Sequence, residues 1–250
     1  MENEWIIELI IFIIGICIGS FLNVVIYRVP KSENIAYPPS HCPKCGKKLK
    51  PWHNIPIISY VLLKGKCAFC REKIPIRYPV IELSTGILAV LIYKKCGVDI
   101  YSTITFIVFA LFLALSMIDF DYKAVPDSLN LLALTLSFFT TPEILENFKN
   151  ALILMGGMSL IRYYVSYFIK REAMGEGDII LAGSIGALLG IKLSLFAIFI
   201  ASLIAIFPSL YNRIFKKDFE LPFIPFLTLG TFIVWYFNDY FLNLWSKLYG

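Results

Sequence analysis

The sequence is poor in charged residues. Asp, Glu, Lys and Arg make up 16% of its 250 residues, whereas hydrophobic residues make up 58%. Soluble domains carry about 25% charged residues. Together with a mean hydropathy of +0.73, this scarcity of charge excludes an ordinary soluble protein.

The first hydrophobic segment, residues 5–27, lacks the marks of a signal peptide. Its start carries Glu2, Glu4 and Glu8 in place of lysines, and no small-residue cleavage site follows it. We therefore expect this segment to remain in the protein as a membrane-spanning helix.

Long runs with almost no charge recur along the chain. A helix of about 17–25 apolar residues spans the ~30 Å hydrocarbon core of a bilayer. The sequence predicts an all-α polytopic membrane protein with about eight transmembrane helices, at 5–27, 79–93, 101–118, 127–141, 144–169, 178–191, 193–212 and 222–246. The fourth and sixth segments are short, so a count of seven stays open.

The basic residues are unevenly distributed. Residues 28–78 hold a large share of the 23 Lys and Arg residues, against only two acids, Glu33 and Glu72. By the positive-inside rule this loop is cytoplasmic. With eight spans, the loops 119–126, 170–177 and 213–221 share that side. The net charge of +5 is then explained by basic loops near anionic lipid, and not by nucleic-acid binding.

The long loop carries two CxxC pairs, Cys42-Pro43-Lys44-Cys45 and Cys67-Ala68-Phe69-Cys70. Two such pairs at this separation are typical of a four-thiolate zinc site. A loop of about 50 residues builds little core, so a metal would supply much of its folding energy. We expect a small cytoplasmic zinc-binding domain between the first two helices.

Two disulfides are the alternative, but a cytoplasmic loop is reducing. His41 and His53 could replace a thiolate, although four cysteines suffice. Cys17 and Cys96 fit no metal pattern, and we expect them to be buried packing residues.

Two carboxylates stand at the edges of hydrophobic segments. Asp119 follows a long apolar run, so it should lie on the last turn of a helix, and Asp178 should lie in the first turn of another. A carboxylate at a membrane boundary is costly unless it has a function. The two could form an acid–base pair that activates water, or they could be unrelated helix-end charges. Gly175 and Gly177 allow close backbone approach.

The neighbouring acids favour structural interpretations. Asp127 follows Pro126 and is a good candidate for a helix N-cap. Asp121 is expected to be solvated in a loop, and Glu176 has no obvious partner in the sequence.

Several motifs occur together in a fixed order. The GxGD motif at 175–178 and Asp119 shortly before Pro126-Asp127 resemble the intramembrane aspartic peptidases that process type IV prepilins. The first half resembles the same family at 19–30, at the two CxxC pairs with His53-Asn54-Ile55-Pro56 between them, and at 77–86. The resemblance covers roughly residues 15–190.

The resemblance implies a bacterial prepilin leader peptidase and N-methyltransferase in the inner membrane, with its active site facing the cytoplasm. Its substrates would be prepilins or pseudopilins of type IV pilus or type II secretion systems, cut after a glycine that follows a basic leader. Asp119 and Asp178 would be the catalytic pair, and the zinc ligands would be Cys42, Cys45, Cys67 and Cys70. S-adenosylmethionine would donate a methyl group to the new N-terminus.

No GxGxxG follows a strand, so the sequence predicts no Rossmann site for the methyl donor. Asn23, Arg28 and Glu82 are candidates because they are polar and lie in the family motifs. Alternatively, Arg28 and Arg77 anchor helix ends and Glu82 pairs with one of them. The expected domains are helix 1–27, zinc-binding and methyltransferase-associated domain 28–78, and peptidase domain 79–250; a homo-oligomer stays open.

Two other classes remain alternatives. One is a GxGD membrane peptidase without methyl transfer, such as an archaeal preflagellin peptidase or a presenilin-like enzyme, and the zinc loop argues against it. The other is a transporter or assembly factor that uses the carboxylates for protons. The outer halves of the spans hold few polar residues, which argues against a polar path.

Overall fold

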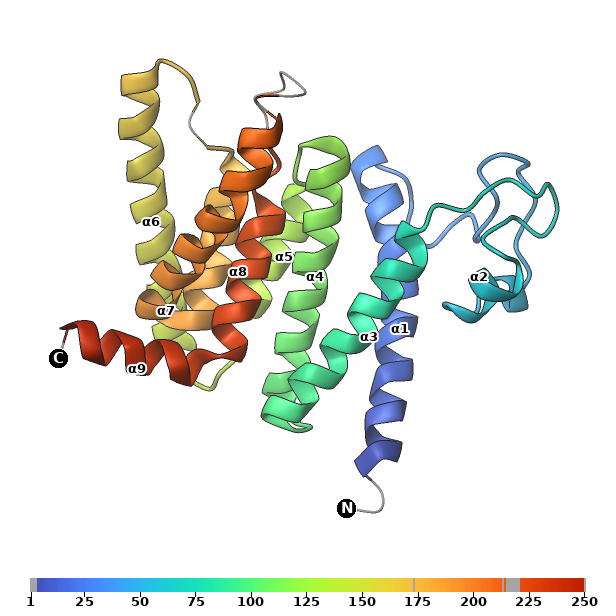
Figure 1. Ribbon diagram of the computed structural model, residues 1–250, viewed down its shortest axis with the longest axis horizontal. Helices are drawn as coiled ribbons and strands as arrows, with labels where there is room; N and C mark the ends of the chain where they lie inside the picture. The colour runs from blue at the N-terminus through green and yellow to red at the C-terminus, as the bar shows by residue number, and fades with distance from the viewer. Residues whose placement is uncertain (1–3, 173, 213, 215–220, 250) are drawn as a thin grey trace. The chain divides into compact units, whose positions relative to one another are not determined.

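The structure is a computed structural model that describes residues 4–172, 174–212, 214 and 221–249. Within them the protein is helical, apart from two isolated β-bridges in the cysteine-containing loop. The predicted all-α class is therefore confirmed. The helices form two compact units, Met1–Gly97 and Val98–Gly250 (Figure 1), and each is described by itself.

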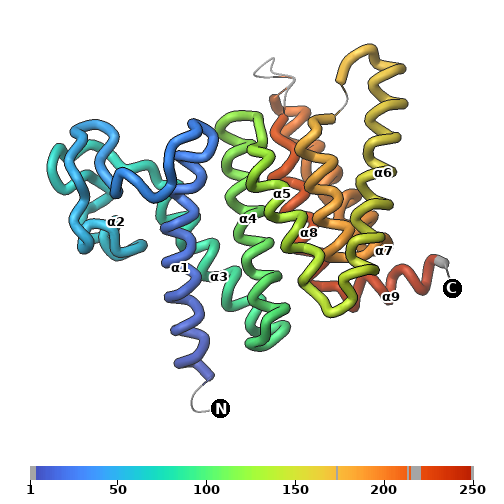
Figure 2. The backbone as a smooth tube through the Cα atoms, turned by 180° about the vertical axis from the view of Figure 1, so that it is seen from behind, coloured from blue at the N-terminus to red at the C-terminus, as the bar shows by residue number. Residues whose placement is uncertain are grey.

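Unit 1 is built on the pair α1 (Glu4–Arg28) and α3 (Arg77–Cys96). The two backbones approach closely: a Cβ added to Gly19 of α1 would lie 2.7 Å from the Cα of Glu82 in α3. Between the helices the chain forms only the short elements η1 (Val29–Lys31), η2 (Pro51–His53) and α2 (Ile58–Leu62). Figure 2 shows this segment as an irregular lobe beside α1.

Unit 2 is a helical bundle whose middle is α7. It comprises α4 (Ile100–Tyr122), α5 (Asp127–Ser137), α6 (Ile144–Ile169), α7 (Glu176–Tyr211), α8 (Ile224–Tyr236) and α9 (Asn238–Tyr249). Helix α7 packs against α5, α6 and α8, and α4 packs against α5 and α8. The largest fully buried side chains include Phe112, Leu115, Ile118, Leu181, Ile185 and Leu227.

Helix α4 has well-defined ends. Asp99 and Ser102 form a reciprocal capping box at its start, which satisfies backbone N–H groups that have no partner inside the helix. At its end Lys123 adopts a left-handed conformation with φ 50°. These ends place Asp119 on the last turn, as predicted.

Helix α7 is broken at Gly190, where φ is 72° and ψ is 166°. Only glycine adopts such a conformation at low cost. Both ends of α7 lie at the same edge of unit 2 (Figure 1), so the chain reverses at the break. The prediction of separate segments on either side of this position is confirmed.

Four helices in the described residues are long and apolar enough to cross a membrane: Glu4–Lys31, Ile100–Tyr122, Ile144–Ile169 and Glu176–Tyr211. This is a multi-pass membrane protein. The prediction of one continuous span at 222–246 is wrong, because the helix stops at Phe237 and α9 turns aside from α8 (Figure 1). The 13-residue α8 is apolar but short.

Candidate active site and metal centre

Asp119 is buried at the end of α4, with 7% of its surface exposed. Its Oδ2 accepts a hydrogen bond of 3.2 Å from the backbone N–H of Ile224, the first residue of α8. The first N–H groups of a helix lack intrahelical partners. The carboxylate at the end of α4 therefore provides a hydrogen-bond acceptor for the first backbone N–H of α8.

Asp178 lies in the first turn of α7 and is half-buried. Its Oδ2 accepts a hydrogen bond of 3.2 Å from the backbone N–H of Gly175, which closes the glycine-containing turn. Asp178 is close enough to Asp119 for the two charges to interact. The structure thus brings the two sequence-predicted carboxylates together in unit 2.

The glycine turn is held from two sides. A Cβ added to Gly177 would lie 2.9 Å from the Cβ of Val125, so the turn has no room for a larger residue. The Gly177 carbonyl accepts a 2.8 Å hydrogen bond from Nδ2 of Asn130, which is fully buried. Sequence reasoning missed Asn130, although an amide inside the apolar segment 127–141 was a usable signal.

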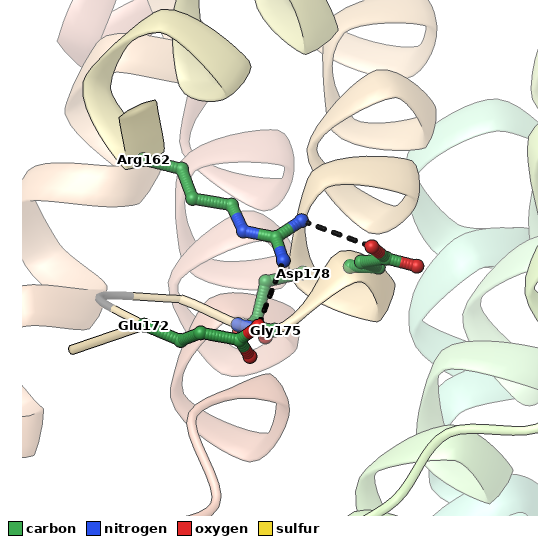
Figure 3. A network of polar contacts seen from close by, with 5 residues as sticks. Arg162, Glu172, Gly175 and Asp178 are labelled. Carbon is green, nitrogen blue, oxygen red and sulfur yellow. Dashed lines mark hydrogen bonds and ion pairs between the residues drawn. The ribbon is translucent and has the colours of Figure 1, made fainter. Parts of the chain in front are cut away.

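Arg162 of α6 also lies beside the turn (Figure 3). Its guanidinium is 3.3 Å from Oε1 of Glu176 and 3.8 Å from Oε1 of Glu172. The expectation that Glu176 has no partner is therefore wrong, because the preceding helix packs so that Arg162, 14 residues earlier, lies beside Glu176. The ion pairs link α6 to the segment that carries Gly175 and Asp178.

Two other acids differ from expectation. Helix α5 begins at Asp127 itself, with Pro126 as N-cap and no side-chain capping bond. Proline fits a helix start because its φ is already near −65°, so Asp127 is displaced into the first turn. Asp121 is exposed, as expected, but it lies on the last turn of α4 and not in a loop, because the helix continues to Tyr122.

The four loop cysteines converge. The Sγ atoms of Cys42, Cys45, Cys67 and Cys70 all lie within 4.8 Å of one another. Both CxxC turns use the same backbone pattern: the N–H groups of Cys42 and Cys67 donate to residues five positions later, and the carbonyls of both cysteines accept from residues four positions later. Four convergent sulfurs fit a tetrahedral metal ion of the zinc type.

The environment of the cysteines differs within the cluster. Burial acts to raise the pKa of Cys67, but hydrogen bonds from the backbone N–H groups of Cys70 and Phe69 lower this pKa to about 7. The backbone N–H of Glu72 acts to lower the pKa of Cys70, but desolvation and the neighbouring sulfurs raise it to about 11. Thiols this close oppose one another's ionisation, which a bound cation would relieve.

The remaining histidines and cysteines lie outside this cluster. His41 Nδ1 is 3.1 Å from the Pro39 carbonyl, and the His53 ring packs edge-on against Phe69. Cys17 and Cys96 are exposed, so the expectation of buried packing is wrong. The physical reason is that the lipid-facing surface of a membrane helix is itself apolar, so a cysteine can lie on that surface without being buried in the protein.

The three candidates for methyl transfer lie in unit 1. Asn23 Nδ2 donates to the Tyr78 carbonyl at 3.1 Å. Arg28 is buried and donates to the carbonyls of Asn34, Ile35 and Pro38. These contacts indicate that Asn23 and Arg28 hold the backbone of residues 34–38 and Tyr78 in place.

Glu82 differs from the other two candidates because it is a buried acid. It is 7% exposed, and its Oε2 accepts a 2.7 Å hydrogen bond from the Ile57 N–H.

Comparison with known proteins gives matches along most of the chain. Residues 13–96 match the bacterial peptidase A24 N-terminal domain, and residues 106–210 match the type IV leader peptidase family. These two regions fall within units 1 and 2 respectively. No solved structure gives a significant match.

Curated relatives cover nearly the whole chain. It is 35% identical to the prepilin leader peptidase/N-methyltransferase of Neisseria gonorrhoeae, over 91% of this chain and 89% of the relative. Identity is 31% with the enzyme of that name from Vibrio cholerae, over 93% and 98%, and 29% with that from Pseudomonas aeruginosa, over 95% and 93%. The chain belongs to the type IV leader peptidase family.

Proposed function

We propose that this protein is a prepilin leader peptidase and N-methyltransferase. It removes the leader from type IV prepilins or pseudopilins and methylates the new N-terminal amine. The observation that carries this conclusion is identity of 35% across 91% of the chain with an enzyme of that activity. The carboxyl pair Asp119 and Asp178 supplies groups suited to peptide hydrolysis.

For cleavage, Asp119 and Asp178 act as one unit. One ionised carboxylate takes a proton from water, and the other, protonated, donates to the scissile carbonyl. The peptide bond lies at the cytoplasmic membrane face, after a glycine that separates the basic leader from the hydrophobic helix. Gly175 and Gly177 form the active-site turn that sets the position of Asp178.

Helix dipoles alone suggest Asp178 as the anion, because it lies at a helix N-terminus, and Asp119 as the acid, because it ends α4. The hydrogen bond from Ile224, however, also sets Asp119 at the N-terminus of α8. Both carboxylates therefore receive a backbone N–H from a helix start. We assign the shared proton to the pair and not to either residue.

The metal of the cysteine cluster is zinc in this proposal. The donor set of four thiolates fits zinc, and Cys42, Cys45, Cys67 and Cys70 would hold it. Its role is to fix the fold of residues 28–78, which have few regular elements.

Methyl transfer uses S-adenosylmethionine, which supplies the methyl group. The site belongs to residues 28–78 and the adjoining helix ends, where Asn23, Arg28 and Glu82 lie. Asn23 and Arg28 hold the backbone through the contacts described above.

The proposed topology has eight crossings in the bacterial inner membrane: α1, α3, α4, α5, α6, the two parts of α7, and α8. The uneven distribution of Lys and Arg supports it, with residues 28–78 on the cytoplasmic side. Part of the basic loop at 213–221 lies outside the described residues. The substrate leader, the cysteine loop and both aspartates share the cytoplasmic face.

The second candidate is a transporter that uses Asp119 and Asp178 for protons. One reaction separates the two functions. The purified protein in detergent is mixed with a prepilin and S-adenosylmethionine, and the product mass is followed. A peptidase and methyltransferase gives loss of the leader and then gain of one methyl group, whereas intact prepilin after long incubation refutes the proposal.

A further inference from the structure

Unit 1 contains a cavity of about 180 Å³ beside the cysteine cluster. Its wall comes from three parts of the unit that are distant in sequence. Cys42 and Cys67 of the cluster form one part, His53 and Tyr60 a second, and the start of α3 with Tyr78 and Glu82 the third. The cavity therefore exists only when the loop is folded against α3.

Glu82 gives this cavity a buried acidic group. Its carboxylate receives hydrogen bonds from the Ile57 backbone N–H, at 2.7 Å, and from the Ser20 side chain. Both donors are neutral, so they orient the carboxylate without cancelling its charge. A buried carboxylate is costly unless an opposite charge comes close to it. The cavity beside Glu82 allows a cationic ligand to approach this carboxylate.

Part of the remaining wall also suits a cation, although Lys73 and Lys44, which pairs with Glu72 at 3.3 Å, line it as well. Tyr60 and Tyr78 contribute aromatic rings, and the faces of such rings attract cations with about 0.5–2 kcal/mol. Nδ1 of His53 is buried with no hydrogen-bond partner among the described residues. Buried polar atoms are normally paired, so this nitrogen is available to a polar group of a ligand.

We propose that this cavity holds the sulfonium-bearing chain of the methyl donor, with Glu82 facing the positive sulfur. The assignment rests on the methyltransferase function proposed above. The cavity is smaller than the roughly 300 Å³ of sites that enclose a whole drug-sized ligand. It fits the charged amino-acid chain, and the nucleoside lies outside it.

The contacts also give the three candidate residues different roles. Asn23 holds the carbonyl of Tyr78 and so fixes part of the wall, whereas Arg28 holds the carbonyls of residues 34, 35 and 38. Neither lines the cavity. Glu82 is the ligand-facing residue, and Asn23 is a positioning residue.

The test compares three ligands by equilibrium binding to the full-length protein in detergent. S-adenosylmethionine carries the sulfonium, S-adenosylhomocysteine has a neutral thioether, and an amine analogue replaces the sulfonium with a protonated amine. The wild-type protein should bind both cationic ligands about tenfold more tightly than the thioether, a difference of about 1.4 kcal/mol.

Glu82→Gln should abolish this preference. The glutamine oxygen can still accept the Ile57 N–H, so the fold is kept while the charge is removed. Glu33→Gln is the matched control, because Glu33 is an exposed acid of the loop between α1 and α3 and lies outside the cavity.

A wild-type protein that methylates pilin but binds the thioether and sulfonium ligands equally overturns the cavity assignment alone, and this comparison needs no variant. The assignment is equally overturned if Glu82→Gln keeps the wild-type preference. A wild-type protein that binds none of the ligands and methylates nothing overturns the proposed methyltransferase together with its site.

Discussion

The two glycines before Asp178 have different surroundings, and this difference is testable. A Cβ at Gly177 would collide with Val125 at 2.9 Å, whereas at Gly175 it would meet only Asp178 Oδ2 at 3.4 Å, an ordinary contact. Gly177→Ala should displace Asp178 and reduce cleavage by about 100-fold, since shifts near 1 Å cost that much. Gly175→Ala is the control and should stay within a few-fold of wild type. Initial rates of leader removal measure both, and equal rates would contradict the proposed role of the turn.

At the residue scale, the sequence predicts the helix-end positions of Asp119 and Asp178 because apolar runs stop at each of them. It does not predict their partners. The N–H that binds Asp119 comes from Ile224, 105 positions later, and the amide that holds Gly177 comes from Asn130, 47 positions earlier. Such contacts depend on which helices pack together, and hydrophobic periodicity carries no information about that.

At the scale of elements, the contact between α1 and α3 depends on small residues. Gly15 and Gly19 lie one helical turn apart on α1, and an added Cβ on either would come within 3 Å of the α3 backbone. Without a strong hydrophobic force between helices in lipid, such close approach supplies much of the packing.

Gly19→Ala should therefore destabilise unit 1 by about 1–3 kcal/mol, because the α3 backbone at Glu82 cannot give way. Gly157→Ala in α6 is the matched control: a Cβ there meets nothing within 4 Å, and alanine favours a helix by roughly 0.5–1 kcal/mol. Thermal unfolding in detergent should show a lower Tm only for Gly19→Ala. A Tm equal to that of wild type would argue against tight helix contact.

Hydropathy predicts the existence of the elements better than their continuity. Segment 222–246 is apolar enough to suggest one span, yet it divides into α8 and α9 at Phe237. The break between 178–191 and 193–212 was predictable because Gly190 and Lys192 interrupt the apolar run. Asn238 and Asp239 directly after Phe237 are a similar interruption, but aromatic residues on both sides keep the average hydropathy of the segment high.

At the scale of the whole molecule, the cysteine loop and the aspartate pair belong to separate compact units. The cysteine spacing predicts the metal cluster because two CxxC turns restrict the sulfur positions. The cavity beside Glu82 was not predictable, since its wall combines three separate stretches of chain.

Removal of the metal should loosen unit 1 and leave unit 2 folded. The pure protein should contain about one zinc per chain. Cys42→Ser should lower this content and make residues 28–78 sensitive to protease, while unit 2 stays resistant. Cys96→Ser, outside the cluster, should keep both metal and resistance. Metal analysis with limited proteolysis gives the answer, and intact Cys42–Cys45 and Cys67–Cys70 disulfides without metal would contradict the zinc assignment.

We propose that Asp119 and Asp178 together hydrolyse the leader peptide bond. The most direct measurement follows leader removal by mass for the wild type, Asp119→Asn, Asp178→Asn and the double variant in detergent. Amide replaces carboxylate at constant size, so the fold should persist while proton transfer fails. Each single variant should lose cleavage as completely as the double variant, because the groups act as one unit, and Asp121→Asn should remain active. Full cleavage by Asp178→Asn would contradict a shared catalytic role of the two aspartates.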